Sequence, residues 1–130
     1  MKRALALIAI ALSLGGCAHV RRAGPLRLGA ADSGRTVQLA VGQTLTLALA
    51  ADLSTGHAWQ VVTPPDARML IVVDSGYGVP PGSAPGAAEQ AWWVCRATGG
   101  GATSMELRYG RPWESAPDAQ QQYTLSVTVK

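Results

Sequence analysis

Apolar and polar residues alternate along most of this chain after residue 35, which is the pattern of strands with one buried face. The clearest case is Thr44–Leu49, where Leu45, Leu47 and Leu49 share one face. Alternation or short apolar runs predict further strands over 36–41, 58–62, 68–73, 90–98, around Met105–Tyr109, and over 123–129. The pattern predicts an all-β fold, an immunoglobulin-like antiparallel β-sandwich of about seven strands, with an open barrel as the alternative.

One long segment, 74–89, interrupts this pattern. It holds four glycines and three prolines in sixteen residues and shows no periodicity. A structureless loop of this length is uncommon in a compact domain unless it is functional or disordered.

The N-terminus has the features of an export signal. Lys2 and Arg3 precede an apolar stretch, 4–14, that is too short to span a bilayer. The stretch ends in Leu14-Gly15-Gly16-Cys17, which resembles a bacterial lipobox, so Cys17 is expected to carry lipid. An ordinary secretory signal with an incidental Cys17 is the alternative.

This interpretation divides the chain into a lipoprotein signal peptide (1–16), a flexible tether from lipidated Cys17 (17–34) and a folded domain (35–130). By resemblance to other lipoproteins, Ala18 after Cys17 implies a bacterial outer-membrane location facing the periplasm. Arg21, Arg22 and Arg27 then lie near lipid headgroups or along a solvated tether. From Arg35 onward six basic and seven acidic residues nearly cancel, so a nucleic-acid partner is not expected.

The chain offers little for catalysis. Cys95 lies in a strand-like run, where a buried, inert thiol is expected, and with Cys17 lipidated it has no disulfide partner. Asp52, Ser54 and His57 sit too close together on one turn to converge as a catalytic triad. We expect no enzyme activity, no cofactor and no metal site, and we expect a monomer.

Two short segments between predicted strands remain as candidates for recognition. Asp52–His57 combines a turn-forming Asp and Gly with Ser54 and Thr55 at the tip. It is either a generic turn or a narrow wedge for another protein's cleft. In Gly110–Glu114, Pro112 fixes the backbone, and Trp113 is either an exposed interface anchor or a side chain folded back beneath Arg111.

These segments resemble motifs of the chagasin-like inhibitors of papain-family cysteine proteases. Ser54-Thr55-Gly56-His57-Ala58-Trp59 is similar to the family's Asn-Pro-Thr-Thr-Gly-aromatic-x-Trp motif, and Leu107–Trp113 to its Leu-x-Tyr-x-Arg-Pro-Trp segment. Ser83-Ala84-Pro85-Gly86 resembles the third, Gly-rich loop. The sequence departs from the pattern at Asp52-Leu53, which replaces Asn-Pro, and at His57, which replaces an aromatic residue.

The resemblance implies a reversible competitive inhibitor that blocks the active-site cleft of a papain-family cysteine protease with three loops. The loop of Thr55 would cover the catalytic cysteine, while the other two would grip the sides of the cleft. The residues it implies as protease contacts are Leu53, Ser54, Thr55, Gly56, His57, Gly86, Ala87, Arg111, Pro112 and Trp113. The alternative is a non-inhibitory envelope lipoprotein that binds another envelope protein or ligand.

Overall fold

The computed structural model describes residues 24–111, 113 and 121–130. Residues 1–16, Cys17 and Pro112 therefore lie outside the described residues, and the signal, lipidation and Pro112 predictions stay predictions. The described chain forms eight strands and two 3-10 helices: β1 (Leu26–Leu28), η1 (Ala30–Asp32), β2 (Thr36–Leu39), β3 (Thr44–Leu49), η2 (Leu53–Thr55), β4 (Ala58–Thr63), β5 (Leu70–Gly78), β6 (Gln90–Ala97), β7 (Gly101–Gly110) and β8 (Gln122–Val129).

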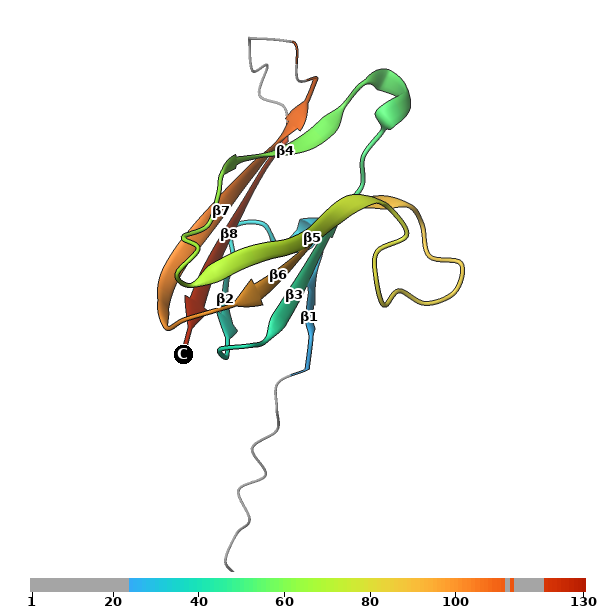
Figure 1. Cartoon of the computed structure of the whole chain (residues 1–130). Coiled ribbons are helices and arrows are strands. Elements are labelled where there is room, and N and C mark those ends of the chain that lie inside the picture. Colours follow the sequence, from blue (N-terminus) through green and yellow to red (C-terminus); the bar gives the residue numbers. More distant parts are fainter. Residues whose placement is uncertain (1–23, 112, 114–120) are drawn as a thin grey trace, which may run out of the picture.

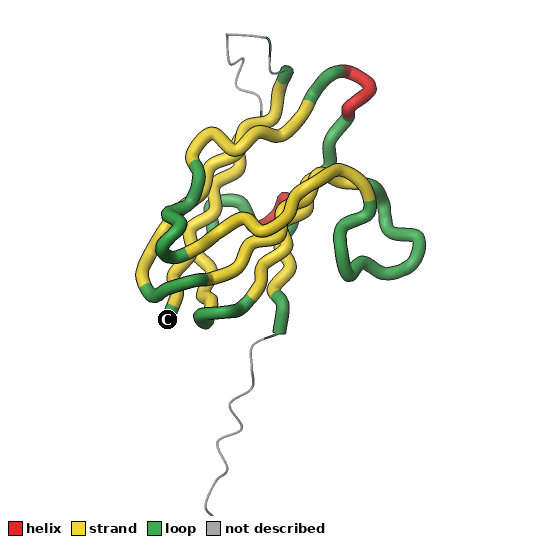
Figure 2. Tube along the Cα trace, viewed as in Figure 1, coloured by secondary structure: helices red, strands yellow, loops and turns green. Residues whose placement is uncertain are grey.

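The strands form two four-stranded sheets, in the orders β1-β3-β6-β5 and β2-β8-β7-β4. The sheets pack face to face as a sandwich, which confirms the predicted fold class (Figures 1 and 2). Most neighbouring strands are antiparallel, whereas β1 runs parallel to β3 and β2 runs parallel to β8.

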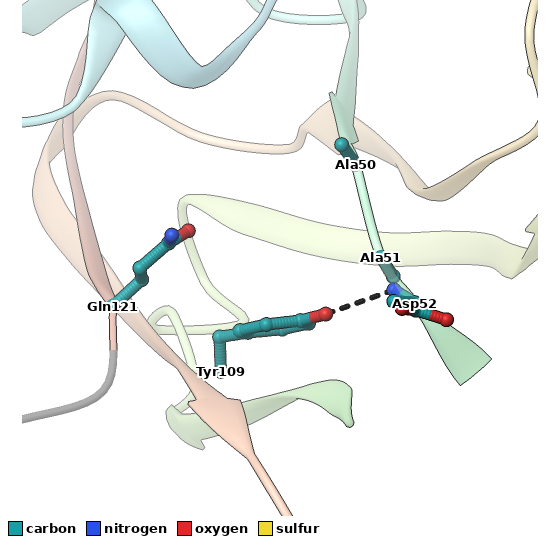
Figure 3. Close-up of a pocket in the computed structure, with 5 residues that line it drawn as sticks. All are labelled: Ala50, Ala51, Asp52, Tyr109 and Gln121. Atoms are coloured by element: carbon teal, nitrogen blue, oxygen red, sulfur yellow. Dashed lines mark hydrogen bonds between the residues drawn. The ribbon is translucent and has the colours of Figure 1, made fainter. Parts of the chain in front are cut away.

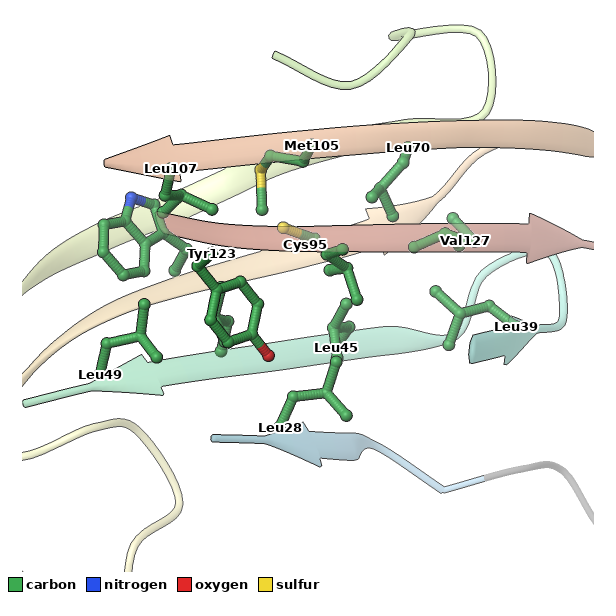
Figure 4. Packing of buried hydrophobic residues seen from close by; sticks show 14 of the residues in the cluster. Leu28, Leu39, Leu45, Leu49, Leu70, Cys95, Met105, Leu107, Tyr123 and Val127 are labelled. Carbon is green, nitrogen blue, oxygen red and sulfur yellow. The ribbon is translucent and has the colours of Figure 1, made fainter. Parts of the chain in front are cut away.

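The core between the sheets follows from the alternation in the sequence. Leu45, Leu47 and Leu49 of β3 are at most 1% exposed, and every second residue of β8 from Tyr123 to Val129 is buried as well (Figure 4). A fully buried leucine contributes roughly 2 kcal/mol of hydrophobic stabilisation. Trp93 packs in this core, while its neighbour Trp92 lies on the outer face against Gly76, as adjacent strand residues must.

The segment expected to be a tether, 17–34, is in its described part a piece of the sandwich. Strand β1 pairs with β3, and Leu28 is buried in the core. The hydroxyl of Tyr123 donates a hydrogen bond to the Gly29 carbonyl (2.9 Å), which fixes this segment to β8. Three residues are too few to show a strand period, so the sequence pattern did not reveal β1.

The segment 74–89 is also more ordered than predicted. Strand β5 continues to Gly78, past a register shift between Val72 and Asp74, and leaves a loop of residues 79–89. Within it, the Ser83 amide donates to the Pro80 carbonyl and the Ala87 amide to the Ala84 carbonyl, both at 3.2 Å. These are two consecutive β-turns, each with a Pro-Gly pair at its centre, and we call this segment the tandem-turn loop.

Candidate functional site

Strands β3, β5 and β7 all end at the same end of the sandwich, which we call the loop end. In one sheet, Leu49 of β3 and Tyr77 of β5 both pair with Ala91 of β6. In the other sheet, Ala58 at the start of β4 pairs with Gly110 at the end of β7. The loop 50–57 and the tandem-turn loop therefore leave from this end, and Arg111 lies there after the last residue of β7 (Figure 1).

The loop 50–57 is stiffened by caps at both ends of helix η2. The Asp52 carboxylate accepts a hydrogen bond from the Ser54 amide (3.1 Å), and Gly56 closes the helix in the left-handed conformation with φ +79°. A hydrogen bond from the Ser54 hydroxyl, helped by the backbone amides, lowers the pKa of Asp52. Asp52 thus restrains the turn where the related motif has Asn-Pro.

The polar side chains at the tip of this loop bond to one another. The Thr55 hydroxyl lies 3.0 Å from the Asp52 carbonyl and 2.6 Å from Nδ1 of His57. Both contacts are satisfied when the hydroxyl donates a hydrogen bond to the carbonyl and accepts one from a protonated Nδ1. Because the Asp52 carboxylate is bonded to Ser54 and not to His57, the tip lacks the carboxylate–histidine–hydroxyl order of a catalytic triad.

Tyr109, on β7, holds the two ends of loop 50–57 together. Its hydroxyl accepts a hydrogen bond from the Asp52 amide (2.8 Å; Figure 3). Tyr109 and Asp52 also line an open hollow of about 310 Å³. The Tyr109 ring stacks on His57, with centroids 5.4 Å apart, and contacts Trp59 at 5.1 Å. The Trp59 indole donates to the Ala50 carbonyl (2.9 Å). Tyr109 belongs to the Leu107–Trp113 motif, but its position in the strand alternation did not mark it as a residue of the site.

Arg111 and Trp113, which follow strand β7, contact this loop. Nε of Arg111 donates a hydrogen bond to the Thr55 carbonyl (3.0 Å). The Trp113 ring lies against Gly56 so closely that a Cβ atom there would overlap it, with Cζ2 only 3.1 Å from that position. Trp113 nevertheless remains 69% exposed. The structure thus brings Thr55, Gly56, Arg111 and Trp113 together as one ridge, from two segments more than fifty residues apart, and we call these four residues the ridge.

The tandem-turn loop takes a different position. It leaves the loop end beside loop 50–57, where the Tyr77 hydroxyl donates to the Ala51 carbonyl (3.5 Å), and then lies to the side of the sandwich (Figure 2). Gly86, with φ +80°, and Ala87 form its second turn. Gly86 is exposed, and no heavy atom lies within 4 Å of the position that a Cβ atom would take on it, so this turn presents backbone to solvent. Leu53 is 48% exposed at the start of η2.

The described part of the chain contains one cysteine, Cys95, and it is not in a disulfide. Cys95 is 0% exposed, and burial raises the pKa of its thiol to about 11, as expected for an inert core cysteine. Across residues 24–111, 113 and 121–130, no group of three or more His, Cys, Asp or Glu could hold a metal ion. In the same residues, no helix is long and apolar enough to cross a membrane.

Comparison with known proteins identifies the family of this chain. Residues 38–127 match the model of the chagasin family peptidase inhibitor I42. The chain belongs to the chagasin family. The match covers β3 to β7 completely, half of β2 and most of β8, so both motif loops and the tandem-turn loop lie within it. No curated protein matches the chain.

Solved structures with the same fold include three proteins of low sequence identity. The cysteine protease inhibitor EhICP2 from Entamoeba histolytica is 19% identical, with a TM-score of 0.68 over 82% of this chain and 96% of its own. Amebosin is 22% identical, with a TM-score of 0.64 over 83% and 100%. PbICP-C, solved in complex with falcipain-2, is 16% identical, with a TM-score of 0.57 over 82% and 92%. This chagasin-family chain therefore shares the fold of cysteine protease inhibitors.

Proposed function

We propose that this protein is a reversible, competitive inhibitor of papain-like cysteine proteases that enters the active-site cleft with the loop end of the sandwich. The observation that carries the proposal is the ridge, in which Arg111 and Trp113 are fixed to Thr55 and Gly56. Membership of a peptidase-inhibitor family supports the proposal, as does the complex of the structural neighbour PbICP-C with falcipain-2.

The geometry of the ridge suits a narrow cleft. Its tip is a capped helical turn with small side chains, so it offers a protease no extended strand to cleave. The caps and the Tyr109 contacts order the loop before binding, which lowers the entropy lost on association. Trp113 adds a large, mostly exposed aromatic surface beside the tip, as binding hot spots commonly do. The tandem-turn loop would contact a second side of the cleft through Gly86 and Ala87.

We further propose that the protein is anchored in the outer membrane through lipid on Cys17, with the domain in the periplasm. The position of Gly24 supports this arrangement, because its carbonyl accepts a hydrogen bond from Gln43 (2.8 Å) at the end opposite the loops. Gly24 lies seven positions after Cys17, and a chain of seven steps spans at most about 25 Å. The loop end would then point away from the membrane and toward a soluble protease.

The first experiment is a titration of residues 24–130 against papain, with trypsin as a control of another catalytic class. This fragment contains every residue of the hydrophobic core. We expect competitive inhibition of papain and none of trypsin. No inhibition of papain at micromolar concentration would refute the proposal, and capture of a stable non-protease partner from envelope extract would favour the binding-module alternative.

The anchor has a separate test. Cells that express the full chain are fed an alkyne-labelled fatty acid, and the label on the protein is measured. We expect Cys17→Ser to abolish labelling and Cys95→Ser to leave it intact, since Cys95 is buried. Equal labelling of the Cys17→Ser variant would refute the lipid anchor and leave the inhibitor proposal untouched.

A further inference from the structure

Strand β1 lies before the family-matched region and yet contacts the tandem-turn loop. The family match begins at Gln38, whereas β1 covers Leu26–Leu28. Because Leu26 and Leu28 face the core, Arg27 between them projects from the outer face of the sheet. Nη2 of Arg27 donates a hydrogen bond to the carbonyl of Pro81, fifty-four residues away (2.9 Å).

The Arg27 guanidinium also fits the shape of the first turn. Gly82 follows Pro81 with φ +73°, a conformation that glycine adopts without strain. A Cβ atom on Gly82 would overlap Nη2 of Arg27, so the guanidinium occupies the space that a side chain would fill. The carbonyl of Pro81 and the bare Cα of Gly82 together form a binding site for the planar guanidinium of Arg27.

The rest of the loop has few restraints. Pro80 is buried, but Pro81, Gly82 and residues 84–86 are exposed. The two turns are closed by single backbone hydrogen bonds at 3.2 Å. A loop held this lightly samples several orientations unless a long-range contact selects one. The bond from Arg27 is such a contact, since it ties the first turn to a strand of the sandwich and so fixes the base of the second turn, which carries Gly86.

We propose that Arg27 is a positioning residue for protease binding: it holds the tandem-turn loop in the orientation in which Gly86 and Ala87 meet the protease. The proposal rests on the proposed inhibitory function and adds a determinant outside the loops themselves. Arg27 acts before the encounter, by raising the fraction of molecules whose loop is ready to bind. When that fraction falls, the apparent affinity falls in proportion.

The principal test compares Arg27→Ala with the unmodified full chain, both purified in detergent, in stopped-flow inhibition of papain. We expect the association rate to fall roughly five- to tenfold and the dissociation rate to stay unchanged, because the protease itself holds the loop in the complex. Arg96→Ala is the matched control, because Arg96 is exposed on the same face of the same sheet and its substitution removes the same charge. It should leave both rates unchanged.

A second pair of variants tests the same contact by changing the loop instead of Arg27. Gly82→Ala should slow association as Arg27→Ala does, and the double variant should be no slower than either single one, because both disrupt one contact. Gly42→Ala provides the strain control, since Gly42 has φ +86° with nothing within 4 Å and lies at the opposite end. It should not alter inhibition.

Amide exchange of Ser83, measured by NMR without protease, gives a readout independent of inhibition. Arg27→Ala should accelerate it, and Arg96→Ala should not. Unchanged association, a change confined to dissociation, an equal effect of Arg96→Ala, or unchanged Ser83 exchange would each overturn the proposal. If the unmodified chain fails to inhibit papain, the proposed function fails instead, and the exchange measurement still shows whether Arg27 restrains the loop.

Discussion

The contact between Gly56 and Trp113 gives the sharpest test of the ridge, through the substitution Gly56→Ala. Gly56 closes helix η2 with φ +79°, and its Cα lies under the Trp113 ring. The added methyl group does two things at once. It strains the backbone of the cap, and it requires the ring to move, because a Cβ atom would lie only 3.1 Å from Cζ2 and nearer still to Cη2.

The backbone strain lowers the folding stability, whereas the displacement of the ring lowers the binding free energy. An alanine in the left-handed conformation costs roughly 1 to 2 kcal/mol of folding stability. Removing a hot-spot tryptophan costs roughly 2 to 4 kcal/mol of binding free energy, and a displaced ring retains part of that. We therefore expect Gly56→Ala to weaken binding to papain by about 1.5 to 3 kcal/mol, or roughly tenfold to 150-fold in Ki.

Gly34→Ala separates strain from displacement. Gly34 has nearly the same backbone angle, φ +81°, but nothing lies within 4 Å of its Cβ position. Thermal or urea unfolding should show similar destabilisation of the two variants, whereas only Gly56→Ala should lose inhibition. Equal inhibition by Gly56→Ala and the unmodified domain would refute the argument that the contact between Trp113 and Gly56 matters for binding.

Three further outcomes follow from the structure. Trp113→Ala should weaken inhibition of papain by about 2 to 4 kcal/mol without unfolding the domain, since the ring is 69% exposed, and a Ki within error would remove it from the site. Thr55→Arg should raise Ki through a steric clash in the cleft, so unchanged inhibition would show that this loop does not enter it. For Cys95, burial raises the folded-state pKa to about 11, above the ordinary thiol value of 9.0, so the stability that the buried thiol contributes is present below pH 9 and is lost as the pH rises toward 11. The free energy of unfolding, measured with urea from pH 8 to 11, should therefore fall less steeply for Cys95→Ala than for the unmodified domain. An equal fall in both proteins would contradict the burial of the thiol.

The sequence pattern sufficed for the sandwich because its signal is local. Alternation over six to ten residues decides which side chains face the core, and Leu45, Leu47 and Leu49 of β3 are buried as that alternation requires. The motifs around Thr55 and Trp113 pointed to the site and to the family for the same reason, since turn residues act over a few positions.

Local reasoning failed where the stabilising contact is distant in the chain. Strand β1 forms because it pairs with β3 and because Tyr123 donates a hydrogen bond to Gly29. Neither contact can be predicted from the three residues of the strand itself. The Pro-Gly pairs at 81–82 and 85–86 did contain the signal for two turns, but loop length and lack of period hid it.

By itself, the sequence determined most of the strands, the exposed turns and the residue types at the tips. Only the tertiary structure decided that Trp113 rests on Gly56, that Arg111 bonds to Thr55, and that Arg27 holds Pro81. Each of these contacts joins segments more than fifty residues apart, and their geometry depends on how the two sheets bring the strand ends together. Periodicity specifies which face of a strand is buried, but only packing specifies which loops become neighbours.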